Sequence, residues 1–385
     1  MNKIKNRECF CGSGKKFKSC CMSKINSQKK IVSDEVLSNP NRLNQLLFER
    51  LKSTDYKTCF YPEKEKCKKP IKNAHTLQNN GILSLISENG HVRIYDLLNK
   101  VRKGTSTKEV SKNSATTFYG FCEYHDSVVF KEIELLPYTA SEKQNFLHAY
   151  RTCAQEYHKK NRMLKAIQNC FKDNPIVVNI PGFIESYENM ELSFKDVEKY
   201  MNIFNEAFKN NDFNILESYV YKFDQMYDFA VTTMFNPTFD INGKMLNDIY
   251  SKDEERLKSV FISILPTQTN SFFIISYLKE DFEHFKEYLE KIKAFTDDQL
   301  KIFLNNLIPT YSENIVLSPR LWDKWTPFSR REYEKVINGE IGDFSKLISL
   351  ELPFDSLEDY IEGLMIKNGA NDMMKKPKYD LFKKN

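Results

Sequence analysis

Four cysteines lie within residues 9–21 of this 385-residue chain, the densest cysteine cluster in the sequence. Two thiolates in a Cys-x-Cys step can bind one ion only if the backbone turns sharply beside them. Residues 12–14, Gly-Ser-Gly, supply such a turn, because glycine adopts positive φ without a steric penalty. A second cysteine pair follows the turn and completes a tetrahedral shell, which predicts a structural Zn²⁺ site. The predicted ligands are Cys9, Cys11, Cys20 and Cys21.

The surroundings of this cluster fit a bound cation. Four thiolates and one Zn²⁺ leave two negative charges, and Lys15, Lys16 and Lys18 lie beside the ligands to offset them. We expect Phe10 and Phe17 to stack next to the site. A peptide this short buries almost no core of its own, so the ion must supply its folding free energy, about 10 kcal/mol or more.

The stretch Cys-Phe-Cys-Gly-Ser-Gly-Lys-Lys-Phe-Lys-Ser-Cys-Cys resembles the SEC-C motif of the SecA translocation ATPase and of many unrelated bacterial proteins. In SecA this motif docks the SecB chaperone and approaches the ribosome. The resemblance therefore implies a docking role, with Lys15, Lys16 and Lys18 as partner-binding residues. It does not imply a translocase, because the chain contains no Gly-x-x-x-x-Gly-Lys-Ser/Thr phosphate loop.

A second Cys/His cluster is spread over residues 59–125. Cys59 and Cys67 flank a short charged loop, and Cys122 and His125 form a Cys-x₂-His pair leading into an expected helix. Two ligands from a loop and two from a helix start are typical of treble-clef zinc geometry. We assign these four residues to a second Zn²⁺ site. The alternative is that they are buried residues that bind no metal.

This second region resembles the zinc-bearing HNH nucleases. The resemblance implies that His75 is the general base that activates water and that Asp126 binds a catalytic Mg²⁺ or Mn²⁺. Ala74 and Thr117 depart from the family pattern, since other metal-binding or polar side chains are usual there. His75 could instead be a structural histidine, or it could replace one of the cysteine ligands.

Composition limits the class of protein and its partners. The chain has 29 Phe, 20 Tyr and 12 Gly, which indicates a globular protein, and no apolar run is long enough to span a bilayer. The N-terminus lacks an apolar signal segment, so we expect a cytoplasmic location, where cysteines favour metal binding over disulfides. Abundant Lys, Asn and Ile are typical of AT-rich bacterial genomes.

Positive charge is unevenly distributed along the chain. Residues 1–30 carry nine Lys or Arg against one acidic residue, Glu8, and this favours an anionic partner, either nucleic acid or an acidic protein surface. The alternative is that these lysines only keep the protein soluble. A second basic stretch consists of Lys57, Lys64, Lys66, Lys68, Lys69 and Lys72.

The sequence predicts four segments: a zinc module at 1–22, a linker at 23–40, a treble-clef/HNH-like region at 41–138 and an α+β domain of unknown function at 139–385. The linker precedes a helix expected over residues 40–53. Further expected strands are 82–86, 91–95, 127–133 and 229–235, with a hairpin at 260–265 and 272–278. Expected helices begin at Ser141, Asp281 and Thr296, the last ending before Pro309. We expect Cys153 and Cys170 to be buried thiols. We expect Trp322 and Trp325 to anchor the core; the alternative is that they stack on exposed bases.

These observations predict a multidomain α+β protein with two zinc modules. Its expected function is to dock a macromolecule, namely nucleic acid, the ribosome or a SecB-like chaperone, through the first module and the basic patches. The alternative function is a metal-dependent HNH-like nuclease in host defence, with His75 as the base.

Overall fold

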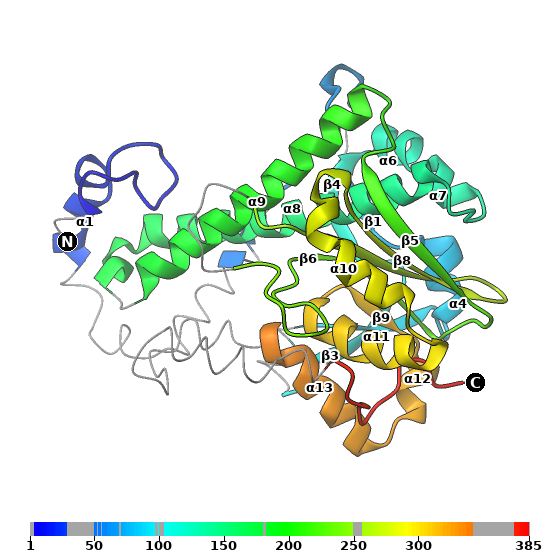
Figure 1. Cartoon of the computed structure of the whole chain (residues 1–385). Helices are drawn as coiled ribbons and strands as arrows, with labels where there is room; N and C mark the ends of the chain where they lie inside the picture. Colours follow the sequence, from blue (N-terminus) through cyan, green and yellow to red (C-terminus); the bar gives the residue numbers. More distant parts are fainter. Residues whose placement is uncertain are drawn as a thin grey trace. The chain divides into compact units, whose positions relative to one another are not determined.

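The computed structural model describes residues 4–28, 50, 51, 53, 54, 56–68, 71–96, 99, 104–179, 182–248, 256–341 and 373–384 (Figure 1). Over these ranges helices and antiparallel strands are mixed, which confirms the predicted α+β class. The chain separates into two compact units. Unit 1 takes its described residues from Met1–Lys57 and Tyr157–Glu198, and unit 2 from Thr58–Glu156, Lys199–Gly342 and Ile361–Asn385.

The described residues form helices of very different lengths. The unit boundaries fall inside the two longest, α8 and α9, so each of these helices supplies residues to both units. The helices are α1 (Met22–Gln28), α4 (Ser84–Ile86), α6 (Glu123–Val129), α7 (Lys131–Leu135), α8 (Glu142–Asp173), α9 (Phe183–Lys209), α10 (Phe282–Lys293), α11 (Asp297–Tyr311), α12 (Pro319–Lys324) and α13 (Pro327–Ile341). Over the part of the chain that the structure describes, none is long and apolar enough to span a bilayer.

Unit 2 contains a seven-stranded sheet in which every neighbouring pair is antiparallel. Its strand order is β3-β2-β9-β6-β7-β8-β5. The strands are β2 (His91–Tyr95), β3 (Thr107–Ser111), β5 (Leu216–Phe223), β6 (Phe229–Phe235), β7 (Val260–Pro266), β8 (Ser271–Leu278) and β9 (Ile315–Leu317). The predicted strands at 91–95 and 229–235 and the predicted hairpin at 260–278 are confirmed. The three-residue strand β9 joins the sheet's early and late parts, since Leu317 pairs with both Arg93 and Phe229.

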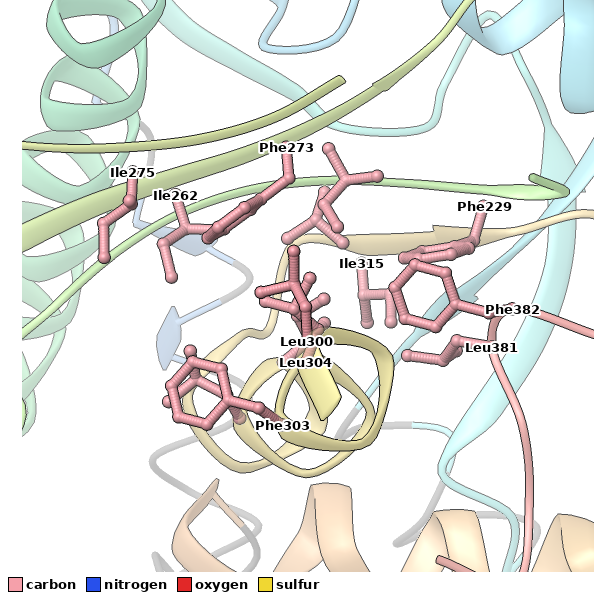
Figure 2. Packing of buried hydrophobic residues seen from close by; sticks show 14 of the residues in the cluster. Phe229, Ile262, Phe273, Ile275, Leu300, Phe303, Leu304, Ile315, Leu381 and Phe382 are labelled. Atoms are coloured by element: carbon pink, nitrogen blue, oxygen red, sulfur yellow. The ribbon is translucent and has the colours of Figure 1, made fainter. Parts of the chain in front are cut away.

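One face of this sheet is covered by α10 to α13 and by residues 373–384, and this layer contains the main core. Figure 2 shows Leu300 and Leu304 of α11 facing the strands, with Phe303 to one side of the helix and Leu381 and Phe382 on the other. Trp322 and Trp325 are buried in this core, as expected for anchors. Their rings are 5.6 Å apart.

Helix α11 continues through Pro309 to Tyr311, so the prediction that it ends before Pro309 is wrong. Proline has no N–H to donate to the carbonyl four residues earlier, which here belongs to Asn305. That carbonyl instead accepts a hydrogen bond of 3.0 Å from the Tyr379 hydroxyl. A distant segment thus replaces the missing bond. The start of α11 is as expected, with Thr296 and Gln299 forming a full capping box.

Two predicted strands are helical in the structure. Residues 82–86 lie in a π-helical turn, Asn79–Leu83, that continues into α4, and residues 127–133 lie in α6 and α7. Ile82, Leu83 and Ile86 are buried with Leu265 and Ile274, which a helical spacing permits. Short apolar runs fit either helix or strand, and here burial of one helical face decides between them.

Unit 1 combines the N-terminal residues with parts of α8 and α9. The linker predicted from residue 23 begins within α1, and residues 29–49, including most of the helix predicted over 40–53, lie outside the described part of the chain. Cys170 in this unit and Cys153 in unit 2 are buried free thiols, as predicted.

Candidate metal centres

The first cysteine cluster is formed by a tight loop. Gly12 and Gly14 have φ values of +71° and +70°, in the left-handed region that glycine adopts without strain. The backbone N–H of Cys9 donates to the carbonyl of Lys15 at 2.7 Å, and that of Gly12 to the carbonyl of Cys9 at 3.0 Å. A side chain at Gly12 would also meet the flexible end of the Gln168 side chain of α8, which would have to move. Glycine is therefore favoured there mainly for its φ.

The four sulfur atoms of this loop converge. All lie within 4.8 Å of one another, with Cys11 Sγ 3.6 Å from Cys20 Sγ and Cys20 Sγ 3.8 Å from Cys21 Sγ. A tetrahedral shell with metal–sulfur bonds of about 2.3 Å places sulfurs about 3.8 Å apart. The four predicted ligands can therefore hold one metal ion.

The cysteines of this cluster differ in their electrostatic environment. Burial raises the pKa of Cys21, because the charged thiolate is poorly solvated there. Burial also acts to raise the pKa of Cys11, but hydrogen bonds from Ser13 and Cys9 outweigh it and lower that pKa to about 7. A metal ion binds cysteine as the thiolate. Burial disfavours the thiolate of Cys21, and a bound cation at this centre would stabilise it.

The aromatic neighbours of this cluster come from distant parts of unit 1. Phe10 and Phe17 are fully buried with centroids 5.9 Å apart, as expected. Phe10 also contacts Phe171 at 5.2 Å and Tyr187 at 5.1 Å. The loop therefore contributes to a core that it shares with α8 and α9, in addition to the little that so short a peptide could bury on its own. Arg7 also ties the loop to α9 through Glu188 at 2.5 Å.

Lys15, Lys16 and Lys18 are exposed on the outer side of this loop. Among the described residues, none of the three forms an ion pair with a carboxylate. Their charges therefore face solvent next to the four converging sulfurs.

The second cluster lies at the junction of a small sheet and a helix in unit 2. Strand β1 (Ile71–His75) pairs antiparallel with β4 (Thr117–Cys122), and α6 follows β4 directly. Cys122 caps the start of α6, and His125 lies in its first turn. Cys59 and Cys67 come from a loop that contains a 3₁₀ turn, Lys64–Lys66. A loop, a hairpin and a helix start together make a treble-clef-like arrangement.

The four predicted ligands of this cluster also converge. His125 Nδ1 lies 3.3 Å from Cys59 Sγ, 3.6 Å from Cys67 Sγ and 3.3 Å from Cys122 Sγ. Tyr61 stacks on the imidazole at 4.2 Å and fixes its plane. Three thiols and one imidazole nitrogen within 4.8 Å of one another can hold a metal ion.

The environment of this centre also shifts the pKa values of its ligands. Burial raises the pKa of the Cys59 thiol to about 12. Burial also acts to raise the pKa of Cys122. Backbone N–H groups of His125 and Lys68 donate to its sulfur, however, and the net effect is a lowered pKa. Burial lowers the pKa of His125, which favours the neutral ring that a metal ion requires.

The basic stretch near this centre is largely balanced by local contacts. Lys66 pairs with Glu63 at 3.1 Å, Lys64 donates to the carbonyl of Cys59, and Lys68 lies over the Tyr124 ring at 5.4 Å. Lys57 is exposed, whereas Lys69 and the side chain of Lys72 lie outside the described part of the chain. This stretch is therefore a weaker candidate for an anion-binding surface than the first loop.

The two predicted catalytic residues are placed differently. His75 ends β1, and its buried Nε2 has no hydrogen-bond partner among the described residues. Burial lowers its pKa, which makes the ring neutral at pH 7. Asp126 lies in the first turn of α6, with an Arg151 guanidinium nitrogen 3.9 Å from its carboxylate. Within the described ranges, neither residue belongs to a group of three or more converging His, Cys, Asp or Glu side chains.

Arg151 is the residue of this region that the sequence did not point to. It is only 3% exposed, binds Glu134 at 2.5 Å and lies over the Phe130 ring at 4.1 Å. Its positive charge thus occupies the place next to Asp126 where a catalytic cation was expected. Arg151 belongs to no sequence motif, so its position next to Asp126 could not be predicted from the sequence.

Comparison with known proteins identifies the first cluster. The family model of the SEC-C motif matches residues 6–23, which include all four cysteines of the first loop. No curated protein and no solved structure gives a significant match to the chain. The resemblance of the N-terminal residues to SEC-C is therefore confirmed, and their four cysteines could hold a metal ion.

Proposed function

We propose that this chain is a zinc-binding protein that docks an anionic macromolecule through its SEC-C module. Four thiolates, or three thiolates and one imidazole, suit Zn²⁺ better than the oxygen-preferring Mg²⁺ or Ca²⁺. Each centre supplies four protein ligands and leaves no open position for substrate. Both are therefore structural centres that stabilise their surroundings.

The observation that carries the docking proposal is that Lys15, Lys16 and Lys18, on a constrained loop, pair with no carboxylate of the described residues. Hydrogen bonds within the loop, its packing against Gln168 and a bound ion would all restrict its movement. A rigid basic surface loses little entropy when it binds an anionic surface. Nucleic acid, free or in the ribosome, supplies the required dense negative charge, and a chaperone with an acidic surface is the other candidate partner.

A triple variant with alanine in place of Lys15, Lys16 and Lys18 is expected to bind a fluorescently labelled RNA hairpin at least about tenfold more weakly near 0.1 M salt. The reason is that its binding releases fewer counterions from the RNA. The slope of log K against log salt should fall by up to about 0.9 for each lysine that contacts a phosphate. Fluorescence anisotropy over a salt series measures both quantities.

The chain offers a matched control for this triple variant. Lys375, Lys376 and Lys378 have the same spacing and are exposed, so their replacement by alanine changes the net charge equally. RNA binding should survive in this control. If both variants lose affinity equally, binding follows net charge and not the module. If the wild type shows no salt-sensitive binding to RNA or DNA, the partner is an acidic protein.

A metal-dependent HNH-like nuclease is the second candidate. The observation that favours it is the neutral ring of His75, whose Nε2 has no hydrogen-bond partner in the part of the chain that the structure describes. The position of Arg151 weighs against it, because this guanidinium already compensates the charge of Asp126 and Glu134. A carboxylate held by arginine is a poor ligand for a divalent ion. We therefore favour docking.

Replacing His75 with alanine separates the two functions. Under the docking proposal, the variant binds RNA as the wild type does, and neither protein cleaves DNA or RNA when Mg²⁺ or Mn²⁺ is added. His91→Ala is the control, since His91 is an exposed histidine of the same unit. Metal-dependent cleavage by the wild type and by His91→Ala, but not by His75→Ala, would establish the nuclease instead.

A further inference from the structure

The four sulfurs of the first centre are not equally accessible. Cys9 and Cys21 are each 2% exposed behind the aromatic residues of unit 1, whereas Cys11 and Cys20 are only partly buried. These two accessible sulfurs are also direct neighbours, 3.6 Å apart. At the second centre the accessible ligand is Cys67 alone, because Cys59, Cys122 and His125 are buried. The first centre therefore has two partly exposed cysteines, and the second has one.

We propose that Cys11 and Cys20 are a peroxide-sensitive pair whose oxidation to a disulfide releases the metal ion of the first centre. The proposal rests on occupancy of that centre by Zn²⁺, as argued above. The reaction needs a small peroxide as its oxidant, which can reach sulfurs at the surface of the loop. Buried thiols such as Cys153 are inert to such reagents by comparison.

The chemistry requires two thiolates and one peroxide. The thiolate of Cys11 attacks one oxygen of hydrogen peroxide, the O–O bond breaks, and Cys11 sulfenic acid and hydroxide form. The thiolate of Cys20 then attacks the sulfenic sulfur, an S–S bond forms, and a second hydroxide leaves. Sulfur loses two electrons and the peroxide gains them. The ion keeps only Cys9 and Cys21 as ligands and dissociates, because a structural site needs four.

The geometry selects this pair over the alternatives. Cys20 and Cys21 are adjacent, so their Cα atoms are about 3.8 Å apart, below the usual range for an unstrained disulfide. Cys9 and Cys21 are shielded by Phe10 and Phe17, which are fully buried. The Cys11–Cys20 bond closes only the exposed loop and leaves that aromatic packing in place. Reduction followed by added Zn²⁺ should therefore restore the centre.

The test uses the full-length zinc-loaded chain. Its metal content is first measured, and the protein is then treated with hydrogen peroxide while a chromogenic chelator reports released zinc. We expect rapid release of about one ion per chain and slower release of the second, because only the first centre exposes two sulfurs. Trypsin cleaves after Arg7, Lys15, Lys18 and Lys24, so mass spectrometry without reduction should detect the peptide 8–15 linked to the peptide 19–24. Each peptide holds two cysteines, so fragmentation of the linked pair must then place the bond between Cys11 and Cys20.

The possible results separate this inference from the proposed function. Untreated protein that carries no zinc at the first centre contradicts the proposed function. Zinc that is bound there but is retained under peroxide, or released while Cys11 and Cys20 remain unlinked, contradicts only the redox inference. Cys170→Ser, which removes a buried thiol of the same unit, should release zinc as the wild type does. Faster release from the second centre would also overturn the inference.

Discussion

Replacing Cys122 with serine is expected to lower the zinc content of the purified chain from two ions to about one and to lower its melting temperature by more than about 10 °C. Cys122 is fully buried at the junction of β4 and α6 and is the ligand that joins the hairpin to the helix. Its loss removes one of four ligands from a centre that ties Cys59 and Cys67 to α6. Zinc binding contributes about 10 kcal/mol or more in small structural sites, which is comparable to the stability of a whole domain.

The control for this variant is Cys153→Ser. Cys153 is equally buried in the same unit but belongs to neither cluster, so its replacement introduces a hydroxyl into the core without removing a ligand. Elemental analysis should find two zinc ions in this control. If the wild type contains one ion per chain, and Cys122→Ser retains it, then the second centre does not bind zinc and only the SEC-C module does.

The two centres differ in how readily the sequence reveals them. The first candidate ligand set occupies thirteen residues and carries its own turn, so spacing alone predicts all four of the cysteines that converge. The second set spans residues 59–125, yet its two ligand pairs are each local, and the structure brings them together. The intervening residues 76–116 have a separate role, because they supply β2 and β3 to the large sheet.

The features that the sequence did not reveal depend on contacts between distant residues. Nothing near Phe10 indicates that Phe171 and Tyr187 surround it, and nothing near Arg93 indicates its pairing with Leu317. The incorrect strand predictions at residues 82–86 and 127–133 have the same origin. Short apolar segments adopt the structure that buries them best, and their neighbours in space decide which one that is.

Deletion of residues 373–385 is expected to leave unit 2 unable to fold stably. The segment buries Tyr379, Leu381 and Phe382 in the main core, at about 1.5–3 kcal/mol each. It also satisfies polar groups of the remaining structure. The Tyr379 hydroxyl binds the Asn305 carbonyl that Pro309 leaves without a helical partner, and the Asp380 carbonyl accepts from Trp325 Nε1 at 3.0 Å. Each buried group left unpaired costs a further 1–3 kcal/mol, roughly.

These losses add up to about 6–15 kcal/mol, which matches the total stability of a typical domain. We therefore expect the truncated chain to be insoluble, or to show no cooperative thermal transition by circular dichroism. Deletion of only the last three residues is the control, since Lys383 and Lys384 are exposed, and it should melt within a few degrees of the wild type. Phe382→Ala should be intermediate, with a loss of about 3–5 kcal/mol. A deletion of residues 373–385 that melts like the wild type would show that this segment is not part of the core in solution, and the continuation of α11 through Pro309 would then need another partner for Asn305.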